Sequence, residues 1–252
     1  MDSPIRSLCL LALVACALPR LAQAGEVQVA VAANFAAPLA KIAEGFAAST
    51  GHTLKVSAGA TGKFYSQIVA GAPYEVLIAA DDETPKKLIK DSLAVAGSNV
   101  TYAIGRLVLW SAQPGFVDDQ GALLAAARFA HLAIANPKIA PYGAAGLEVL
   151  KARGVLDAIT PKLVTAESIG QAYQFVATGN AELGFVALSQ VAVPGKQSIG
   201  SYWLVPQSLY GEIRQDAVLL TAGEKNPAAL ALLAYLTGDA AKRVIQAFGY
   251  GR

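Results

Sequence analysis

The sequence predicts an α/β protein of two lobes, with mainly parallel sheets covered by helices. Two observations lead to this prediction. Short apolar runs that favour strands alternate along the chain with stretches of helical periodicity, which is the pattern of α/β folds. In addition, about 228 of the 252 residues remain once an N-terminal leader is set aside. This length exceeds the roughly 100–150 residues of a usual single domain, so two lobes are expected.

The leader has the features of a secretory signal peptide. Arg6 precedes an apolar run over 7–18, and Ala22-Gln23-Ala24 matches an A-x-A cleavage site. The run is shorter than the roughly 20 apolar residues that span a bilayer. We therefore expect residues 1–24 to be removed and Gly25 to begin a periplasmic mature chain.

Both cysteines of the chain, Cys9 and Cys16, belong to this leader. Leu13-Val14-Ala15-Cys16 allows a second interpretation as a lipobox, which would place a lipid anchor on Cys16. After cleavage at the A-x-A site the mature chain has no thiol, disulfide or cysteine metal site. The leader also contains two basic residues and one acidic residue, so the net charge falls from +2 to +1. This balance predicts no affinity for nucleic acid or for an anionic membrane.

The first part of the mature chain contains three predicted strands, each followed by a helix. Apolar β runs predict the strands at 26–33, 53–57 and 74–80. Helical periodicity predicts helices from Asn34 to about residue 49, over 63–70, and from Thr84 with Pro85 in its first position.

The rest of the chain builds a second lobe and then returns to the first. A long β run over 102–111 is a candidate crossover. Strands are predicted at 131–135, 165–168, 183–187, 202–205 and 213–221, and helices at about 142–153, 169–177, 227–236 and 240–248. The strand over 213–221 carries the chain back, so lobe I comprises 25–105 plus 208–252 and lobe II comprises 106–207. Two crossovers imply a hinged cleft, a common place for a ligand site.

Four strand-to-helix junctions carry the strongest functional signal. Each places small or hydroxyl residues at a helix N-terminus, at 33–35, 59–62, 136–143 and 167–170. The first N–H groups of a helix have no intrahelical partner, and the helix dipole adds about half a positive charge there. Such an end binds anions without lysine or arginine. In α/β folds, ligands bind beyond the carboxyl ends of the strands, where these junctions lie.

Each junction offers particular donors. Asn34 is a favourable N-cap whose side-chain amide can also donate, and Thr61 offers a hydroxyl and an N–H. Tyr142 offers an N–H and a phenol, and the Ile169 N–H opens a helix after Ser168. Taken singly, each residue has an ordinary structural explanation as a cap or as packing. The four together favour one shared anion site.

Seven segments spread over the mature chain form a specific set. They are V-A-A-N-F (31–35), S-A-G-A-T-G-K-F-Y-S-Q-I (57–68), G-A-P-Y-E-V-L-I-A-A-D (71–81), T-Y-A-I-G-R-L-V-L-W-S-A (101–112), N-P-K-I-A-P-Y-G (136–143), E-S-I-G-Q-A (167–172) and L-G-F-V-A-L-S-Q (183–190). Together they resemble the periplasmic molybdate-binding proteins of ABC-type uptake systems. The resemblance covers essentially the whole mature chain.

The resemblance implies a type II periplasmic binding protein fold that buries a dehydrated tetrahedral oxyanion, molybdate or tungstate. The family's ligand positions fall on Ala33, Asn34, Thr61, Tyr142 and Ile169. Many members carry a ligand tyrosine where this chain has Ala187, whereas a subgroup carries it at the position of Tyr142. Molybdenum would be bound only as the oxyanion, without a further cofactor. The implied partner is an ABC-type permease, and the protein is expected to be a monomer and not an enzyme.

All the assigned groups donate hydrogen bonds, which suits an anion without a proton. Monohydrogen phosphate would bring an unpaired O–H, which costs about 1–3 kcal/mol when buried. Sulfate has no proton either, so its exclusion must depend on cavity size. Molybdate and tungstate are nearly equal in size, and the sequence does not separate them.

An enzyme is the main alternative from another class. Residues 59–63 superficially resemble a phosphate-binding loop, but two residues separate the glycines where that motif has four, and Phe64 follows the lysine. His52 and His131 lack the spacing of a catalytic or zinc motif. The acidic run over 81–83 could hold a metal ion, but its place at a helix start favours a capping role.

Two further alternatives concern the ligand and the class. Sulfate, phosphate, a ferric–anion complex or an organic acid could replace molybdate; a carboxylic acid would usually require a cleft arginine. Arg106, near the first crossover, is the nearest candidate, and its β position favours the hinge or surface. Trp110, Trp203 and Tyr202 could instead form an exposed adhesive patch, although their apolar neighbours favour packing.

Overall fold

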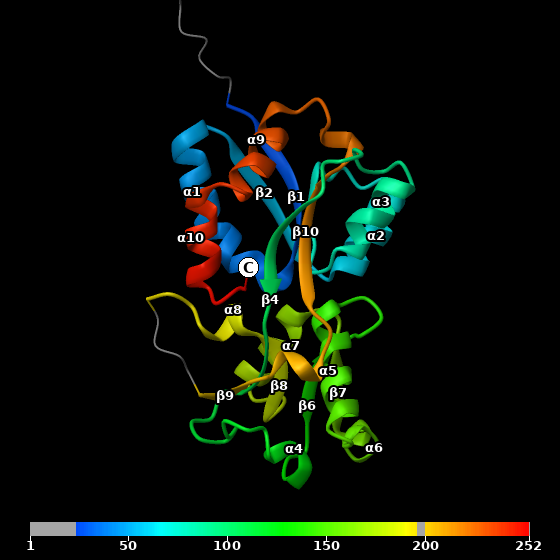
Figure 1. Ribbon diagram of the computed structural model, residues 1–252, viewed down its shortest axis with the longest axis vertical. Helices are drawn as coiled ribbons and strands as arrows, with labels where there is room; N and C mark the ends of the chain where they lie inside the picture. Colours follow the sequence, from blue (N-terminus) through cyan, green and yellow to red (C-terminus); the bar gives the residue numbers. More distant parts are fainter. Residues whose placement is uncertain (1–23, 196–199, 252) are drawn as a thin grey trace, which may run out of the picture.

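The computed structural model describes residues 24–195 and 200–251, which form two α/β lobes stacked end to end (Figure 1). Each lobe contains one five-stranded mixed sheet. Nearly all of the predicted signal peptide, with the lipobox at Cys16, lies outside the described residues. In the described part of the chain, no helix is long and apolar enough to cross a membrane.

Lobe I contains a sheet with the strand order β2-β1-β3-β10-β4. Its strands are β1 (Glu26–Ala32), β2 (Thr53–Gly59), β3 (Val76–Ile78), β4 (Val100–Gly105) and β10 (Ile213–Leu219). β1 pairs in parallel with β2 and β3, and β10 runs antiparallel between β3 and β4. The return of β10 makes this lobe discontinuous in sequence.

Helices cover both faces of the lobe I sheet (Figure 1). They are α1 (Ala36–Thr50), α2 (Thr61–Val69), α3 (Glu83–Lys90), α9 (Pro227–Leu236) and α10 (Asp239–Ala247). Apolar residues of α1, α9 and α10 form one core cluster with the sheet, and those of α2 and α3 contribute to a second. The sheet is thus buried on both sides, and its strand ends are the places left for a ligand.

Lobe II repeats this architecture with the strand order β7-β6-β8-β5-β9. Its strands are β5 (Leu107–Ser111), β6 (Leu132–Ala135), β7 (Leu163–Ala166), β8 (Leu183–Ala187) and β9 (Ser201–Leu204). The longer helices are α5 (Pro141–Ala152) and α7 (Ile169–Ala177); α4 (Leu123–Ala126), α6 (Leu156–Ile159) and α8 (Leu188–Val191) have four residues each. Short 3-10 turns lie at Ala33–Phe35, Thr160–Lys162, Gln207–Leu209 and Thr221–Gly223.

Two segments connect the sheets. Between β4 and β5 there is only Arg106, which is exposed, and its carbonyl accepts from the Leu188 N–H at 2.9 Å. The β run predicted over 102–111 is therefore two strands in different sheets. The second crossover lies between β9 and β10. The C-terminus lies beside β4 near the junction of the lobes (Figure 1), where Gly251 forms a bridge with Ile104.

Several predicted boundaries need correction. The strand predicted at 74–80 is reduced to β3, because the chain turns before and after it. α2 begins at Thr61, two residues earlier than predicted, and α3 begins at Glu83, so Pro85 occupies the third helical position. The short helices α4, α6 and α8 were not predicted, because a single turn has no measurable periodicity.

Candidate anion-binding site

One small cavity between the lobes brings together all five residues predicted as anion ligands. It offers about 200 Å³ of space free of protein atoms, part of which is open to solvent. Its lining consists of Ala33, Asn34, Thr61, Tyr142 and Ile169, with Ala32, Gly59, Ala60, Ala80, Ala140 and Pro141. Among the described residues that line it, none is charged. Both lobes therefore contribute neutral groups to one site.

Thr61 is the first residue of α2 and is almost completely buried. Its Oγ1 accepts a hydrogen bond at 3.0 Å from the N–H of Ala80, which lies two residues after the end of β3. A hydroxyl has one proton and can accept while it donates. The hydroxyl oxygen accepts from Ala80, so the hydroxyl proton does not take part in that bond. Because Thr61 lines the cavity, this proton is available to a ligand there.

Two lobe II helices direct their N-termini at the cavity. Tyr142 is the second residue of α5, and Ile169 is the first residue of α7. Pro141 begins α5, where the N–H that proline lacks would have no partner within the helix. Ser168 caps α7, since its Oγ accepts from the Gln171 N–H at 3.2 Å. The backbone N–H groups of Tyr142 and Ile169 lie in the first turn, where anions are stabilised.

A glycine fixes the position of α5 against its strand. An added Cβ on Gly143 would lie 2.1 Å from the Ala135 carbonyl oxygen, which is far inside contact distance. Only glycine permits this approach of the helix start to the end of β6. Gly143 therefore allows the start of α5 to lie against the end of β6, and this close packing places the neighbouring donor residue, Tyr142.

Asn34 does not have the capping role that the sequence predicted. It lies in the 3-10 turn Ala33–Phe35, and α1 begins after Phe35 without a side-chain cap. The Asn34 Nδ2 instead donates to Gln215 Oε1 at 2.9 Å and to the Tyr250 hydroxyl at 3.0 Å. Both amide protons are therefore occupied, and Oδ1 is buried without a hydrogen-bond partner. For the cavity, Asn34 offers its backbone N–H as a donor.

The Tyr142 hydroxyl is completely buried and reaches across to lobe I. It accepts a hydrogen bond from Gln215 Nε2 at 3.0 Å. Burial raises the pKa of Tyr142 well above its usual value, and the hydrogen bond from Gln215 opposes this rise. The phenol therefore stays protonated, and able to donate, throughout the neutral range.

Direct contacts join the lobes around the cavity. The Gly62 N–H donates to the Ile139 carbonyl at 2.9 Å, and the Ser189 hydroxyl donates to the Asn34 carbonyl at 2.8 Å. At the exposed rim, Lys63 Nζ lies 3.4 Å from Glu167 Oε2. The structure thus describes a form in which the lobes meet over the site.

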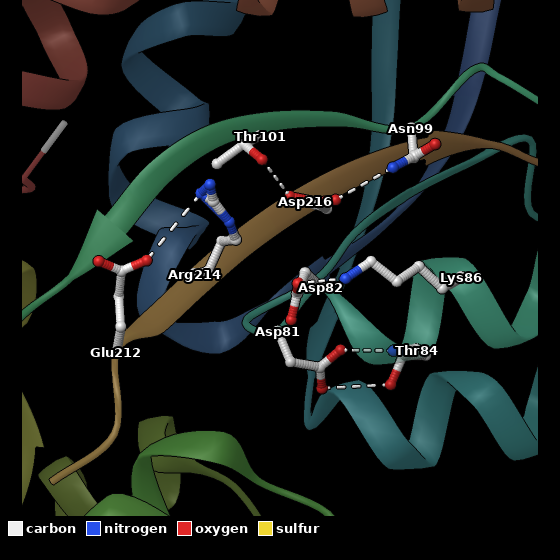
Figure 2. Close-up of polar contacts among 9 residues, drawn as sticks. All are labelled: Asp81, Asp82, Thr84, Lys86, Asn99, Thr101, Glu212, Arg214 and Asp216. Carbon is white, nitrogen blue, oxygen red and sulfur yellow. Dashed lines mark hydrogen bonds and ion pairs between the residues drawn. The ribbon is translucent and has the colours of Figure 1, made fainter.

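The acidic residues that follow β3 are bound within lobe I and do not line the cavity. The acidic run after β3 serves the start of α3, as the capping interpretation predicted: the Asp81 carboxylate accepts from the Thr84 N–H at 2.8 Å and from its hydroxyl (Figure 2). Burial raises the pKa of Asp81, and the bonds from Thr84 oppose this rise. Asp82 pairs with Lys86. In the described part of the chain, no cluster of metal-ligating residues suited to an ion was found.

A more deeply buried carboxylate lies on β10. Asp216 accepts from the Thr101 hydroxyl at 2.6 Å and from Asn99 Nδ2 at 3.3 Å (Figure 2). Neither Asp216 nor Arg214, whose guanidinium lies 4.0 Å from the Glu212 carboxylate, lines the cavity. Of the three aromatic residues considered as an exposed patch, Trp110 and Trp203 are buried and Tyr202 is exposed.

Sequence reasoning missed the polar residues that support the site from behind. Gln215, Tyr102 and Tyr250 are buried and hydrogen-bonded to one another or to Asn34. Gln215 and Tyr250 lie 181 and 216 residues away from Asn34, so no local pattern links them. One signal was available: Gln215 interrupts an otherwise apolar face of its strand, between Ile213 and Ala217.

Two α/β lobes that meet over a small cavity of neutral donors define a two-lobed ligand-trapping protein. A family model described as bacterial extracellular solute-binding protein matches residues 27–251, and the chain belongs to this family.

Individual relatives are consistent with this assignment. The chain is 62% identical over 239 residues to the molybdate-binding protein ModA of Azotobacter vinelandii, covering 95% of this chain and 93% of that protein. It is 53% identical over 234 residues to ModA of Rhodobacter capsulatus, covering 93% and 90%. The solved Azotobacter vinelandii periplasmic molybdate-binding protein superposes with a TM-score of 0.87 at 44% identity, covering 90% of this chain and 99% of that one.

These comparisons confirm the resemblance to the molybdate-binding proteins and the fold that it implied. The relatives are named as binding proteins and not as enzymes, in agreement with the prediction. A sulfate-binding protein of Mycobacterium tuberculosis shares the fold at a TM-score of 0.71, but at 11% identity it indicates the fold alone.

Proposed function

We propose that this protein captures molybdate, and also tungstate, in the periplasm and delivers the anion to an ABC-type permease. The supporting observation is the cavity in which uncharged groups of both lobes converge, with Thr61 from lobe I and the α5 and α7 N-termini from lobe II. The names of the relatives at 62% and 53% identity supply the ligand class.

The donors of the site fit a fully deprotonated tetrahedral oxyanion. We assign four groups of ligands: the backbone N–H groups of Ala33 and Asn34, the hydroxyl and N–H of Thr61, the N–H and phenol of Tyr142, and the Ile169 N–H. Hydrogen bonds to a charged partner contribute about 1.5–3 kcal/mol each, roughly twice the value for neutral pairs. The donors compensate for the hydration that the anion loses.

Selection among oxyanions has two separate causes in this proposal. Monohydrogen phosphate is rejected because its O–H would face donors, leaving a buried polar group unpaired at a cost of about 1–3 kcal/mol. Sulfate is rejected by size, because a smaller anion cannot reach donors fixed on both lobes at once. Molybdate and tungstate are too similar for either cause to separate them.

Calorimetric titration of the mature chain with molybdate, tungstate, sulfate and phosphate tests this proposal. We expect tight binding of the first two with affinities within about tenfold of one another, and binding of sulfate and phosphate weaker by at least about a hundredfold, or about 2.7 kcal/mol. Sulfate binding as tight as molybdate binding would overturn the size argument, and no binding of molybdate would overturn the function.

A further inference from the structure

The strand that returns the chain to lobe I buries a glutamine directly behind the cavity. Gln215 lies on β10 with no exposed surface, at a point where the register between β10 and β4 shifts. Such irregularities redirect side chains and often occur next to functional sites. A buried amide also needs hydrogen-bond partners. Two of the partners of Gln215 are candidate ligands of the anion.

Gln215 joins these two candidates across the lobe boundary. Its Nε2 donates to the Tyr142 hydroxyl of lobe II at 3.0 Å, and its Oε1 accepts from Asn34 Nδ2 of lobe I at 2.9 Å. The Tyr102 hydroxyl lies 2.9 Å from the same Oε1. The Tyr102 hydroxyl also donates to the Ala79 carbonyl at 2.8 Å, so its one proton is shared between the two acceptors. The Asn34 amide is therefore the contact that turns Gln215 Oε1 towards lobe I and Nε2 towards Tyr142.

This orientation determines where the Tyr142 proton can go. A phenol has a single proton, and its oxygen can accept while the proton is donated elsewhere. Because the Tyr142 oxygen accepts from Gln215, the proton cannot return to that amide and remains available to the cavity that Tyr142 lines. A bound oxyanion offers an acceptor there.

The opposite orientation would have the opposite effect. If the amides of Gln215 and Asn34 were both rotated, Gln215 Oε1 would take the Tyr142 proton. Asn34 Nδ2 would then occupy the position at which Oδ1 now has no partner. The anion would receive its donor from Asn34 instead of Tyr142. The two arrangements therefore differ in the anion affinity expected of Tyr142→Phe, which lacks the phenol oxygen.

Space for the contact comes from Gly105, the last residue of β4. An added Cβ there would lie 2.3 Å from the Tyr142 oxygen and 2.5 Å from Gln215 Nε2. A side chain at the start of the first crossover would thus push both groups away. Gly105 offers an independent way to disturb the pair without changing either member.

We infer that Gln215 is a positioning residue for anion binding, which holds the Tyr142 hydroxyl so that its proton is directed at the bound oxyanion. The inference rests on the proposed function, since it requires an anion in the cavity. Gln215 itself does not line the cavity. Its effect on affinity must therefore pass through Tyr142, and this dependence can be measured.

A double-mutant cycle with molybdate tests the inference. Gln215→Met removes the donor at similar length, Tyr142→Phe removes the hydroxyl, and calorimetry gives the affinity of each variant and of the double variant. We expect each single substitution to weaken binding about tenfold or more, and the double variant to be no weaker than Tyr142→Phe. Tyr210→Phe is the matched control: it removes another buried phenol, bonded to the Leu107 N–H, and should stay within about twofold of wild type.

A spectroscopic measurement separates positioning from general structural support. At saturating molybdate, donation by a phenol to an anion perturbs the tyrosine absorbance. We expect this difference signal in the wild-type chain and in Tyr210→Phe, and its loss in both Tyr142→Phe and Gln215→Met. A glutamine that only stabilised the fold would weaken binding but leave the signal at saturation intact, and this result would overturn the inference.

Other results would also overturn it. One is unchanged affinity of Gln215→Met; another is a double variant that loses the product of the two single losses. A third is Tyr142→Phe binding like wild type while Gln215→Met is weak, which would assign the donor to Asn34. If Gln215→Met does not fold, Gln215→Asn replaces it in the same cycle, because it keeps a buried amide but shortens its reach towards Tyr142. Failure of the wild-type chain to bind molybdate would instead refute the proposed function.

Discussion

At the scale of single residues, Thr61 is the ligand candidate whose contribution is easiest to isolate. We predict that Thr61→Ala weakens molybdate binding by about ten- to a hundredfold, because a hydrogen bond to a charged partner contributes about 1.5–3 kcal/mol. The substitution also leaves the buried Ala80 N–H without its acceptor, so some loss of stability should accompany it. Calorimetric titration and thermal unfolding of the same samples measure both effects.

Thr61→Ser is the matched control for this prediction. It keeps the hydroxyl that accepts from Ala80 and removes only a methyl group from a buried position. We expect its affinity to remain within a few-fold of wild type. If Thr61→Ala bound molybdate as tightly as Thr61→Ser, the hydroxyl would not be a ligand, and the assignment of this junction would be wrong.

Four of the five ligand candidates could be proposed from the sequence because each belongs to a local pattern, whereas Ala33 was added by the family resemblance. A strand end, a small or hydroxyl residue and a helix start lie within a few positions of each other, and this spacing is visible in the sequence. The side-chain role of Asn34 was different. Its amide is occupied by Gln215 and Tyr250, and these contacts exist only after the chain has returned from lobe II.

At the scale of elements, α7 links a local cap to the anion site. We predict that Ser168→Ala lowers the free energy of unfolding by about 1 kcal/mol, because the Gln171 N–H loses its acceptor. The Ile169 N–H should remain in place but be held less firmly, so the affinity for molybdate should fall only a few-fold. Chemical denaturation and calorimetry measure these two quantities.

Ser168→Asn provides the control, since asparagine is as good an N-cap as serine and adds no charge near the anion. Its stability should equal that of wild type within about 0.5 kcal/mol. Equal stability of Ser168→Ala and Ser168→Asn would show that the cap has no measurable role in holding this helix start.

The order and type of the longer elements follow from the sequence, because burial on one or both faces imposes a regular period. The lobe boundary at Arg106 does not follow from the sequence. The segment around it reads as one β run, since the strands on either side of the residue are both apolar. Which sheet each half joins depends on pairing with β10 in lobe I and with β8 and β9 in lobe II. These partners lie between about 75 and 115 residues further along the chain.

At the scale of the whole molecule, the site is complete only when the lobes meet. Thr61 belongs to lobe I, whereas Tyr142 and Ile169 belong to lobe II, and within residues 24–195 and 200–251 the chain crosses between the lobes twice. A ligand that gains donors from both lobes binds the closed form better, and this difference in affinity is what shifts the equilibrium towards closure. The exposed pair of Lys63 and Glu167 contributes little to closure, since pairs of this kind contribute about 0–1 kcal/mol.

We therefore predict that small-angle scattering of the mature chain shows a smaller radius of gyration with saturating molybdate than without it. Sulfate at the same concentration should leave the radius unchanged, because it does not gain the donors of both lobes. Gly62 and Ile139 already share a backbone hydrogen bond across the cleft in the closed form, so the anion-free chain must break this contact to open. Equal radii with and without molybdate would mean that the lobes stay closed, and that selection among anions occurs without a hinge.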